Sequence, residues 1–289
     1  DSSQIPTYLI SKLMHKEAKV ILSGDGGDEF YGGYNRYLYL NLIRFFSKNI
    51  PLKIKKNLSL ILKFLPINIL NKYLTSFNIK NFENKLTKFI SFIDTENDID
   101  LYDKVTSLNS RFNYFFTNKI INKKDFFEKK ELIEELNSKE NFMYLDQIGY
   151  LPDDVLCKVD RATMYNSIES RAPFLDHKLV EHSWRIPIEY KIKGNNGKLI
   201  VKDILSDYLP NKLISRSKSG FAIPIDSLLR TKLKYWADEI FKNMTKINDE
   251  INYENIRIAW EKHKDNKINA GGVLWSVLVL QNWFNQNQK

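Results

Sequence analysis

A chain of 289 residues with 43% apolar content can bury a substantial core, and its length suits one or two domains. Its single cysteine, Cys157, excludes an internal disulfide framework and agrees with a reducing, cytoplasmic compartment. The formal charge of +9 would suit nucleic acid or a membrane surface, but the sequence has no RNA-binding motif, zinc-finger spacing or basic-region helix. We therefore expect no nucleic-acid partner and no membrane partner.

The first predicted elements are a helix and a strand. Ser2 or Ser3 can cap a helix that has Pro6 in its first turn and continues through Leu13. The apolar, partly β-branched run from Val20 to Leu22 then predicts a buried strand over 19–22. A helix that leads directly into a buried strand implies parallel neighbouring strands, so we expect an α/β domain.

Most of the remaining chain has the apolar spacing of helices. Residues 38–140 carry no motif to which chemistry can be assigned, and we interpret them as a variable helical insert. Within it, the basic and apolar segment 44–63 is interpreted as one helix of a bundle, although a helix lying on a membrane is an alternative. Beyond the insert we expect helices divided at Pro152, and loops around 193–197 and 215–224.

Glycines and carboxylates follow the predicted strand at once, in the order Ser23-Gly24-Asp25-Gly26-Gly27-Asp28-Glu29. Acids at the carboxyl end of a strand lie where open α/β sheets bind ligands. Glycines let backbone N–H groups approach an anion, and carboxylates beside an anion are tolerated when a divalent cation lies between them. The run is not a Rossmann fingerprint, a Walker A loop or a calcium loop. A glycine-rich turn with solvated acids remains the structural alternative.

Further motifs follow in a fixed order. They are Leu151-Pro152-Asp153-Asp154, Asp160-Arg161, Glu169 to Asp176, Gly197-Lys198, Tyr208-Leu209-Pro210, Arg216 to Pro224, and Leu274-Trp275. Together with the glycine-acid run, they resemble the synthetase domain of glutamine-hydrolysing asparagine synthetases, a class II glutamine amidotransferase family. The similar blocks cover roughly residues 1–37 and 140–285.

The resemblance implies a fold and a domain organisation. Residues 1–289 would form the C-terminal part of a pyrophosphate-loop, adenine-nucleotide-α-hydrolase-like α/β domain that is mostly helical in this chain. The family's N-terminal glutaminase domain and its Ser-Gly-Gly-x-Asp-Ser pyrophosphate loop are absent from these residues. We therefore expect a fragment of a longer or split protein, with that missing part as partner and without activity alone. A homodimer is left open.

The reaction implied by the resemblance is amide formation driven by ATP and Mg²⁺. Aspartate and ATP would give β-aspartyl-AMP and pyrophosphate, and ammonia from glutamine would then give asparagine and AMP. One alternative is a related amidotransferase acting on another carboxylate, such as a uronic acid of a surface polysaccharide. A second alternative is a non-catalytic helical interaction fragment.

Residue roles also come from the resemblance. By this resemblance, Asp28 matches a magnesium-ligating aspartate and Lys198 matches an essential lysine. These roles suit the implied reaction, because adenylation needs cations that stabilise the departing pyrophosphate. Asp25 stands where many relatives carry glutamate, and is expected either to act on the incoming amine or to order aspartate or ammonia. Substrate and ATP contacts are expected from Ser23, Gly24, Gly26, Gly27, Asp154, Arg216 and Lys218. The structural alternatives are helix N-caps for Asp28 and Asp154 and a solvated loop lysine for Lys198.

Four charged residues near the second motif are expected to have a structural role. Asp160, Arg161, Glu169 and Arg171 read as internal ion pairs on and after a buried helix. Cys157 is expected to be a small buried core residue.

Overall fold

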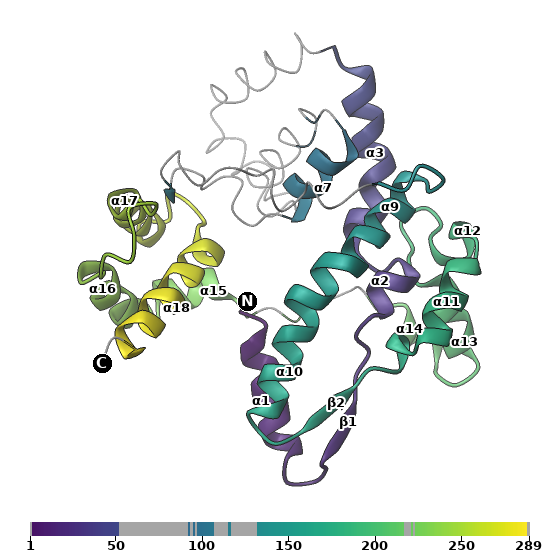
Figure 1. Cartoon of the computed structure of the whole chain (residues 1–289), viewed down its shortest axis with the longest axis horizontal. Coiled ribbons are helices and arrows are strands. Elements are labelled where there is room, and N and C mark those ends of the chain that lie inside the picture. The colour runs from purple at the N-terminus through teal and green to yellow at the C-terminus, as the bar shows by residue number, and fades with distance from the viewer. Residues whose placement is uncertain are drawn as a thin grey trace.

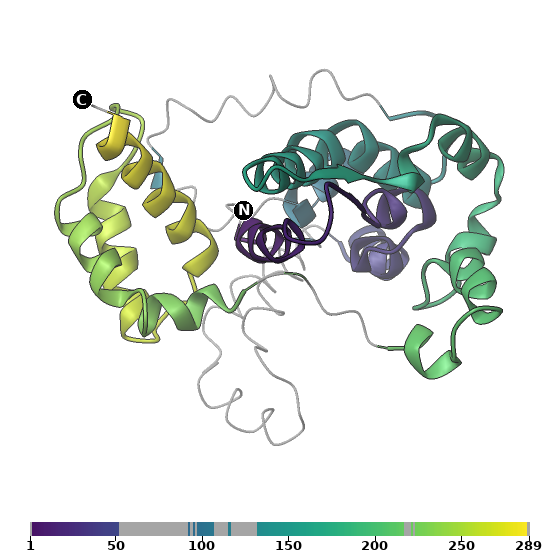
Figure 2. The ribbon, with the colours of Figure 1, turned by 90° about the horizontal axis from the view of Figure 1, so that it is seen from below.

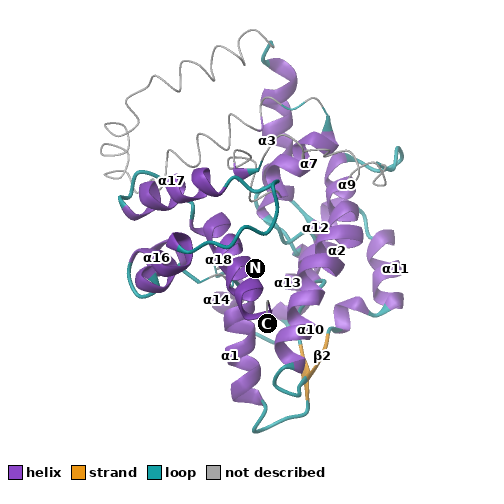
Figure 3. Ribbon diagram, turned by 60° about the vertical axis from the view of Figure 1, so that its left-hand side comes forward, coloured by secondary structure: helices purple, strands orange, loops and turns teal. Residues whose placement is uncertain are grey.

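The described part of the chain is mostly helical and contains one short parallel sheet, which confirms the α/β expectation (Figure 3). The computed structural model describes residues 2–51, 92, 95, 97–106, 115–116, 132–216, 221 and 223–287. The strands are β1 (Val20–Leu22) and β2 (Glu169–Arg171). The helices are α1 (Gln4–Met14), α2 (Gly27–Tyr31), α3 (Asn35–Asn49), α7 (Asp98–Thr106), α9 (Ser138–Leu145), η2 (Asp146–Leu156), α10 (Cys157–Met164), η3 (Pro173–Leu175), α11 (His177–Arg185), α12 (Ile188–Lys191), α13 (Leu199–Ser206), α14 (Asn211–Ile214), α15 (Ile225–Arg230), α16 (Lys234–Lys242), α17 (Tyr253–Lys264) and α18 (Gly271–Asn287).

The sheet joins two segments that are far apart in the sequence. Strand β1 pairs with β2 in parallel, with Ile21 opposite Ser170, so the expected parallel neighbour is present. The prediction that β1 is buried was wrong, because Val20 is 40% exposed and Leu22 is 75% exposed. Successive side chains of a strand point to opposite faces. Ile21 lies beside residues of α1 and α10, whereas the face that carries Val20 and Leu22 is left open by the described residues.

A continuous helical rod runs through α9, η2 and α10 (Figure 1). Asn137 and Glu140 form a capping box that begins it. The predicted break at Pro152 was wrong, because this proline lies inside the π-helical stretch η2. An α-helix would force the proline ring against the carbonyl four residues earlier, and the wider π-helical turn relieves that clash.

The apolar side chains form separate clusters of buried residues. One lies between α3, α7 and α9 and includes Tyr37, Leu40, Leu101, Phe142 and Leu145. A second lies under α2 and η2 and includes Phe30, Tyr31, Leu151 and Val155. A third cluster fills the bundle of α15 to α18, whose helices lie together on one side of Figure 2. It includes Leu229, Phe241, Ile256, Trp260 and Leu274.

Two structural expectations from the sequence need correction. Arg171 Nε donates to Glu169 Oε1 over 2.8 Å, but both side chains are more than half exposed, so this pair is not internal. Asp160 and Arg161 are also exposed, because they lie on the outer side of α10. Cys157 is partly buried rather than fully buried.

Much of the predicted insert, 38–140, lies outside the described residues, as does segment 52–63 of the expected basic helix. The described part of the insert includes helix α7 and nearly all of α3. Among the described helices, none combines the length and apolarity needed to cross a membrane.

Candidate active site

The glycine-acid run forms a tight turn from β1 into α2. Gly26 is the residue before α2 and has a φ of +88°, a left-handed conformation that side chains with a Cβ seldom adopt. A Cβ at Gly26 would also collide with Leu175. The turn therefore needs glycine here, and it places Asp28 and Glu29 in the first turn of α2.

Asp28 meets Lys198 across this turn. Lys198 precedes α13, and its backbone N–H donates to the carbonyl of Tyr31 over 3.0 Å. Its Nζ lies 2.9 Å from Asp28 Oδ1, and the two side chains are 32% and 23% exposed. The structure thus brings together the residues predicted to hold the metal and to neutralise the phosphates.

Glycines make this approach possible. A Cβ at Gly33 would overlap the Asp28 carboxylate and the Lys198 side chain, and a Cβ at Gly197 would overlap the carbonyl of Gly32. Any larger residue at Gly33 or Gly197 would therefore separate the two segments that carry Asp28 and Lys198.

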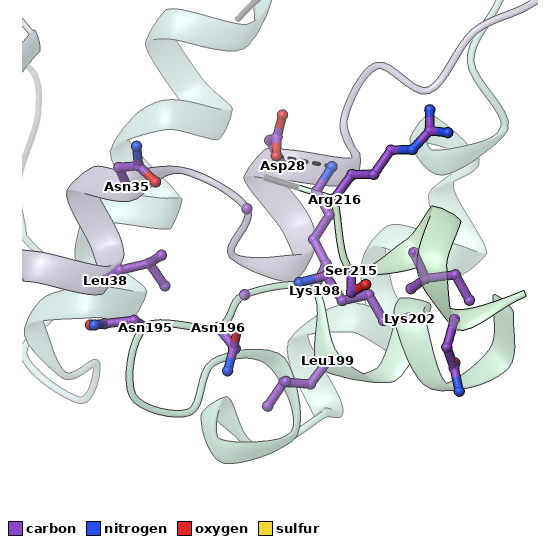
Figure 4. A pocket seen from close by; sticks show the side chains of 14 residues that line it. Asp28, Asn35, Leu38, Asn195, Asn196, Lys198, Leu199, Lys202, Ser215 and Arg216 are labelled. Atoms are coloured by element: carbon purple, nitrogen blue, oxygen red, sulfur yellow. Dashed lines mark ion pairs between the residues drawn. The ribbon is translucent and has the colours of Figure 1, made fainter. Parts of the chain in front are cut away.

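A cavity of about 570 Å³ opens beside the pair (Figure 4). Asp28, Lys198, Lys202 and Arg216 line it, with Lys202 on α13 and Arg216 after α14. Figure 4 shows the Lys198 side chain directed at Asp28. Three cations and one carboxylate around one cavity give a positive site that suits a polyphosphate carrying a divalent cation.

Asp25 lies in a different cavity, of about 310 Å³, between α1, β1 and α10. The Ser23 hydroxyl donates to Asp25 Oδ2 over 2.8 Å, and Ser23, Lys158 and Thr163 line the same cavity. The predicted site residues are therefore divided. Asp28, Lys198 and Arg216 face one cavity, Ser23 and Asp25 face the other, and the glycines form the turn between them.

One predicted ligand contact lies elsewhere, and another is not among the described residues. Asp154 is inside η2 and lines neither cavity. Its alternative reading as a helix N-cap was wrong, because the helical rod runs through this position. Lys218 lies outside the described residues.

Sequence reasoning missed some residues of the larger cavity. Lys202 follows Lys198 by one helical turn, and its backbone N–H donates to the Lys198 carbonyl over 2.9 Å, so an i, i+4 pattern of lysines was a usable signal. Asn195 and Asn196 also line the cavity, but nothing in their sequence context distinguishes them from ordinary loop residues.

The residues present fit a magnesium ion that is bound mainly through phosphate. No cluster of three or more histidine, cysteine, aspartate or glutamate side chains occurs within the described part of the chain. Magnesium commonly uses one or two carboxylates together with substrate phosphates and water. A single carboxylate at a cavity wall, such as Asp28, suits this mode. It does not suit a metal that is held by protein ligands alone.

The chain resembles known proteins over nearly its whole length. The asparagine synthase family matches residues 1–285, so the chain belongs to that family. A glutamine-hydrolysing asparagine synthetase of Bacillus subtilis, numbered 1, is 27% identical over 298 residues, which cover 99% of this chain and 43% of the relative. A putative glutamine-hydrolysing asparagine synthetase of Mycobacterium tuberculosis is 24% identical over 284 residues, with 98% and 42% covered.

A shorter match is more similar. A putative glutamine-hydrolysing asparagine synthetase of Methanocaldococcus jannaschii is 53% identical over 38 residues, which cover 13% of this chain and 7% of the relative. No solved structure matches the chain significantly. The chain thus spans about 43% of the length of the Bacillus relative.

Proposed function

We propose that this chain is the C-terminal part of the synthetase domain of an ATP-dependent amide-forming ligase. The proposed reaction begins when a carboxylate oxygen of aspartate attacks the α-phosphorus of ATP, which forms β-aspartyl-AMP and releases pyrophosphate. Ammonia derived from glutamine then attacks the acyl carbon, and asparagine and AMP leave. Family membership and the cavity beside Asp28 and Lys198 support this proposal.

The observation that carries the proposal is the Asp28–Lys198 pair inside a cation-rich cavity. Asp28 would hold Mg²⁺, which neutralises phosphate charge when bound. Lys198 would stabilise the negative charge that grows on the departing pyrophosphate, with Arg216 and Lys202 adding to the positive potential. Such charge stabilisation is effective because the groups are already in place before the reaction.

Asp25 is proposed to act in the step after adenylation. It lies in a cavity apart from the phosphate-facing cations, where its carboxylate is held by the Ser23 hydroxyl. A carboxylate in this position would accept a proton from the attacking ammonium-derived amine. The division of acids between the cavities therefore favours separate roles for Asp25 and Asp28.

The open side of β1 favours a further segment of the same synthetase. Leu22 and Val20 are exposed there, and parallel sheets are normally covered on both faces. We propose that the part of the protein carrying the pyrophosphate loop covers this side of the sheet. The share of each relative that the chain leaves unmatched is long enough to contain such a segment.

The test is pyrophosphate release by the full-length protein with ATP and magnesium. Aspartate should support release, and a uronic acid should not. A strong preference for the uronic acid would show that the acceptor is not aspartate, while the proposed ligase reaction would still hold. Absence of release with every carboxylate would favour the non-catalytic interaction fragment and overturn the proposal.

A further inference from the structure

A buried polar network lies beside the proposed phosphate cavity and has no role in the mechanism above. Its centre is Asp146, which is fully buried at the start of η2. Tyr102 donates to Asp146 Oδ1 over 2.6 Å, Arg36 Nε donates to Asp146 Oδ2 over 2.7 Å, and the Tyr37 hydroxyl donates to the same oxygen. A buried carboxylate is tolerated only with partners of this kind.

The network continues from Asp146 to α2. The guanidinium carbon of Arg36 lies 4.0 Å from the ring centre of Tyr34 and 4.8 Å from that of Tyr150. Tyr34 donates to Glu29 Oε1 over 2.6 Å, and Glu29 is almost fully buried. Glu29 is the direct neighbour of Asp28, so one chain of contacts leads from Asp146 to the proposed metal ligand.

A second connection runs through the neighbour of Asp146. Gln147 Nε2 donates to the backbone carbonyl of Glu29 over 3.1 Å, and Gln147 Oε1 accepts a hydrogen bond from Trp184 Nε1 over 3.0 Å. Two consecutive residues of η2 therefore hold Glu29. Gln147 binds its backbone directly, and Asp146 reaches its side chain through Arg36 and Tyr34. Since α2 is only 5 residues long, its position depends on such outside contacts.

Helix α3 connects the network with the cavity wall. Its residues Arg36 and Tyr37 bind Asp146, while Asn35 and Leu38 line the cavity that contains Asp28 and Lys198. A shift of α3 relative to η2 would therefore change the cavity wall directly. Tyr102 brings in α7, which belongs to the predicted insert.

We propose that Asp146, Arg36 and Tyr102 are positioning residues that fix α2 and α3 around the phosphate cavity, and that α7 acts on the cavity through the Tyr102 hydroxyl. The inference rests on the proposed function only where it names polyphosphate as the ligand. The insert thereby gains a role in the site. Among its described residues, those that face the cavity lie on α3.

Tyr102→Phe is the central test, because it removes a hydroxyl and leaves the buried ring. Loss of a hydrogen bond to a buried charged group should increase hydrogen exchange of residues 27–35 about tenfold in the full-length protein. Exchange in α17 and α18 should stay unchanged. Tyr39→Phe is the matched control, since Tyr39 lies on α3 and is 47% exposed.

Binding of magnesium pyrophosphate, measured by calorimetry, gives a second readout. Tyr102→Phe and Asp146→Asn should each weaken it about tenfold, because the cavity wall is no longer held. Unchanged exchange of residues 27–35 in both variants, or an equal increase along the whole protein, would overturn the proposal. Failure of the proposed function has a different signature, because the wild-type protein would then release no pyrophosphate while the exchange comparison still stands.

Discussion

Lys198 Nζ lies 2.9 Å from Asp28 Oδ1, although one residue precedes α13 and the other lies in α2. The contact depends on a backbone hydrogen bond, from the Lys198 N–H to the Tyr31 carbonyl, that fixes the two segments side by side. The pair therefore forms a preassembled site in which a cation and a potential metal ligand face the same cavity.

Replacing Lys198 by methionine in the full-length protein should abolish pyrophosphate release and leave glutaminase activity intact. Loss of a cation that stabilises the transition state typically lowers the rate by about a hundredfold or more. Pyrophosphate release and glutamate formation should be measured in parallel. Lys193→Met is a suitable control, because Lys193 is exposed in the preceding loop and does not line the cavity. Near-wild-type release by Lys198→Met would remove this lysine from the site.

Gly33→Ala should disrupt the Asp28–Lys198 pair. The added Cβ would overlap both side chains, and overpacking of this kind typically costs about 1–3 kcal/mol. Gly272→Ala is the matched control, because nothing lies within 4 Å of a Cβ at that position. Chemical denaturation and magnesium pyrophosphate binding should separate the two variants. Equal behaviour of both would show that the close packing around Gly33 is not required.

The sequence predicted the local elements better than their surroundings. Helix α1, strand β1 and the glycine turn follow from short-range patterns, and the helical spacing near the chain start marks α1 correctly. The exposure of Leu22 could not be predicted, because an apolar pattern reports the character of a strand and not what covers it. Pro152 was misjudged because a widened helical turn can accept a proline.

The candidate site shows the same division. Asp28 and Lys198 were found through motifs, whereas Asn195 and Asn196 line the cavity from the turn just before Lys198 and belong to no motif. Asp25 and Asp28 are close in sequence, yet they face different cavities because Gly26 turns the chain between them. The sequence motif therefore pointed to both acids but could not show that they face different cavities.

The buried tyrosines predict a loss of stability at alkaline pH. Burial raises the pKa of Tyr102, and also that of Tyr37, above the usual value of a tyrosine. The unfolded chain loses these protons near pH 10 and the folded chain keeps them, so the free energy of unfolding should fall as pH rises above about 10. Each such tyrosine contributes a slope of up to about 1.4 kcal/mol per pH unit.

Melting temperatures between pH 8 and pH 11 test this dependence. Tyr102→Phe should make the alkaline decrease shallower, because one titrating group is removed. Tyr235→Phe should leave it unchanged, because Tyr235 is 78% exposed. An identical slope in wild-type protein and Tyr102→Phe would contradict the prediction.

The 289-residue chain alone should produce no AMP from ATP, aspartate and ammonia. The nucleotide loop expected from the family resemblance is absent from its sequence, and the face of β1 that carries Leu22 is uncovered by the described residues. Chromatographic detection of AMP with magnesium ATP is the measurement. Addition of a separately expressed segment that carries the loop should restore turnover, and turnover by the chain alone would contradict the fragment interpretation.

Asp28→Asn and Asp25→Asn in the full-length protein should affect different steps. Asp28 faces the cation-lined cavity beside Lys198, so losing its charge should raise the magnesium concentration needed for pyrophosphate release and slow adenylation. Asp25 accepts a hydrogen bond from the Ser23 hydroxyl in the other cavity. Losing the Asp25 charge should therefore leave pyrophosphate release unchanged and lower amide formation. The discriminating measurement is the ratio of pyrophosphate to amide across a magnesium titration. Excess magnesium should rescue Asp28→Asn in part and leave Asp25→Asn unchanged. If both variants lose the two activities in parallel and magnesium rescues neither, the separate roles are wrong and the glycine-acid run is better described as a structural turn.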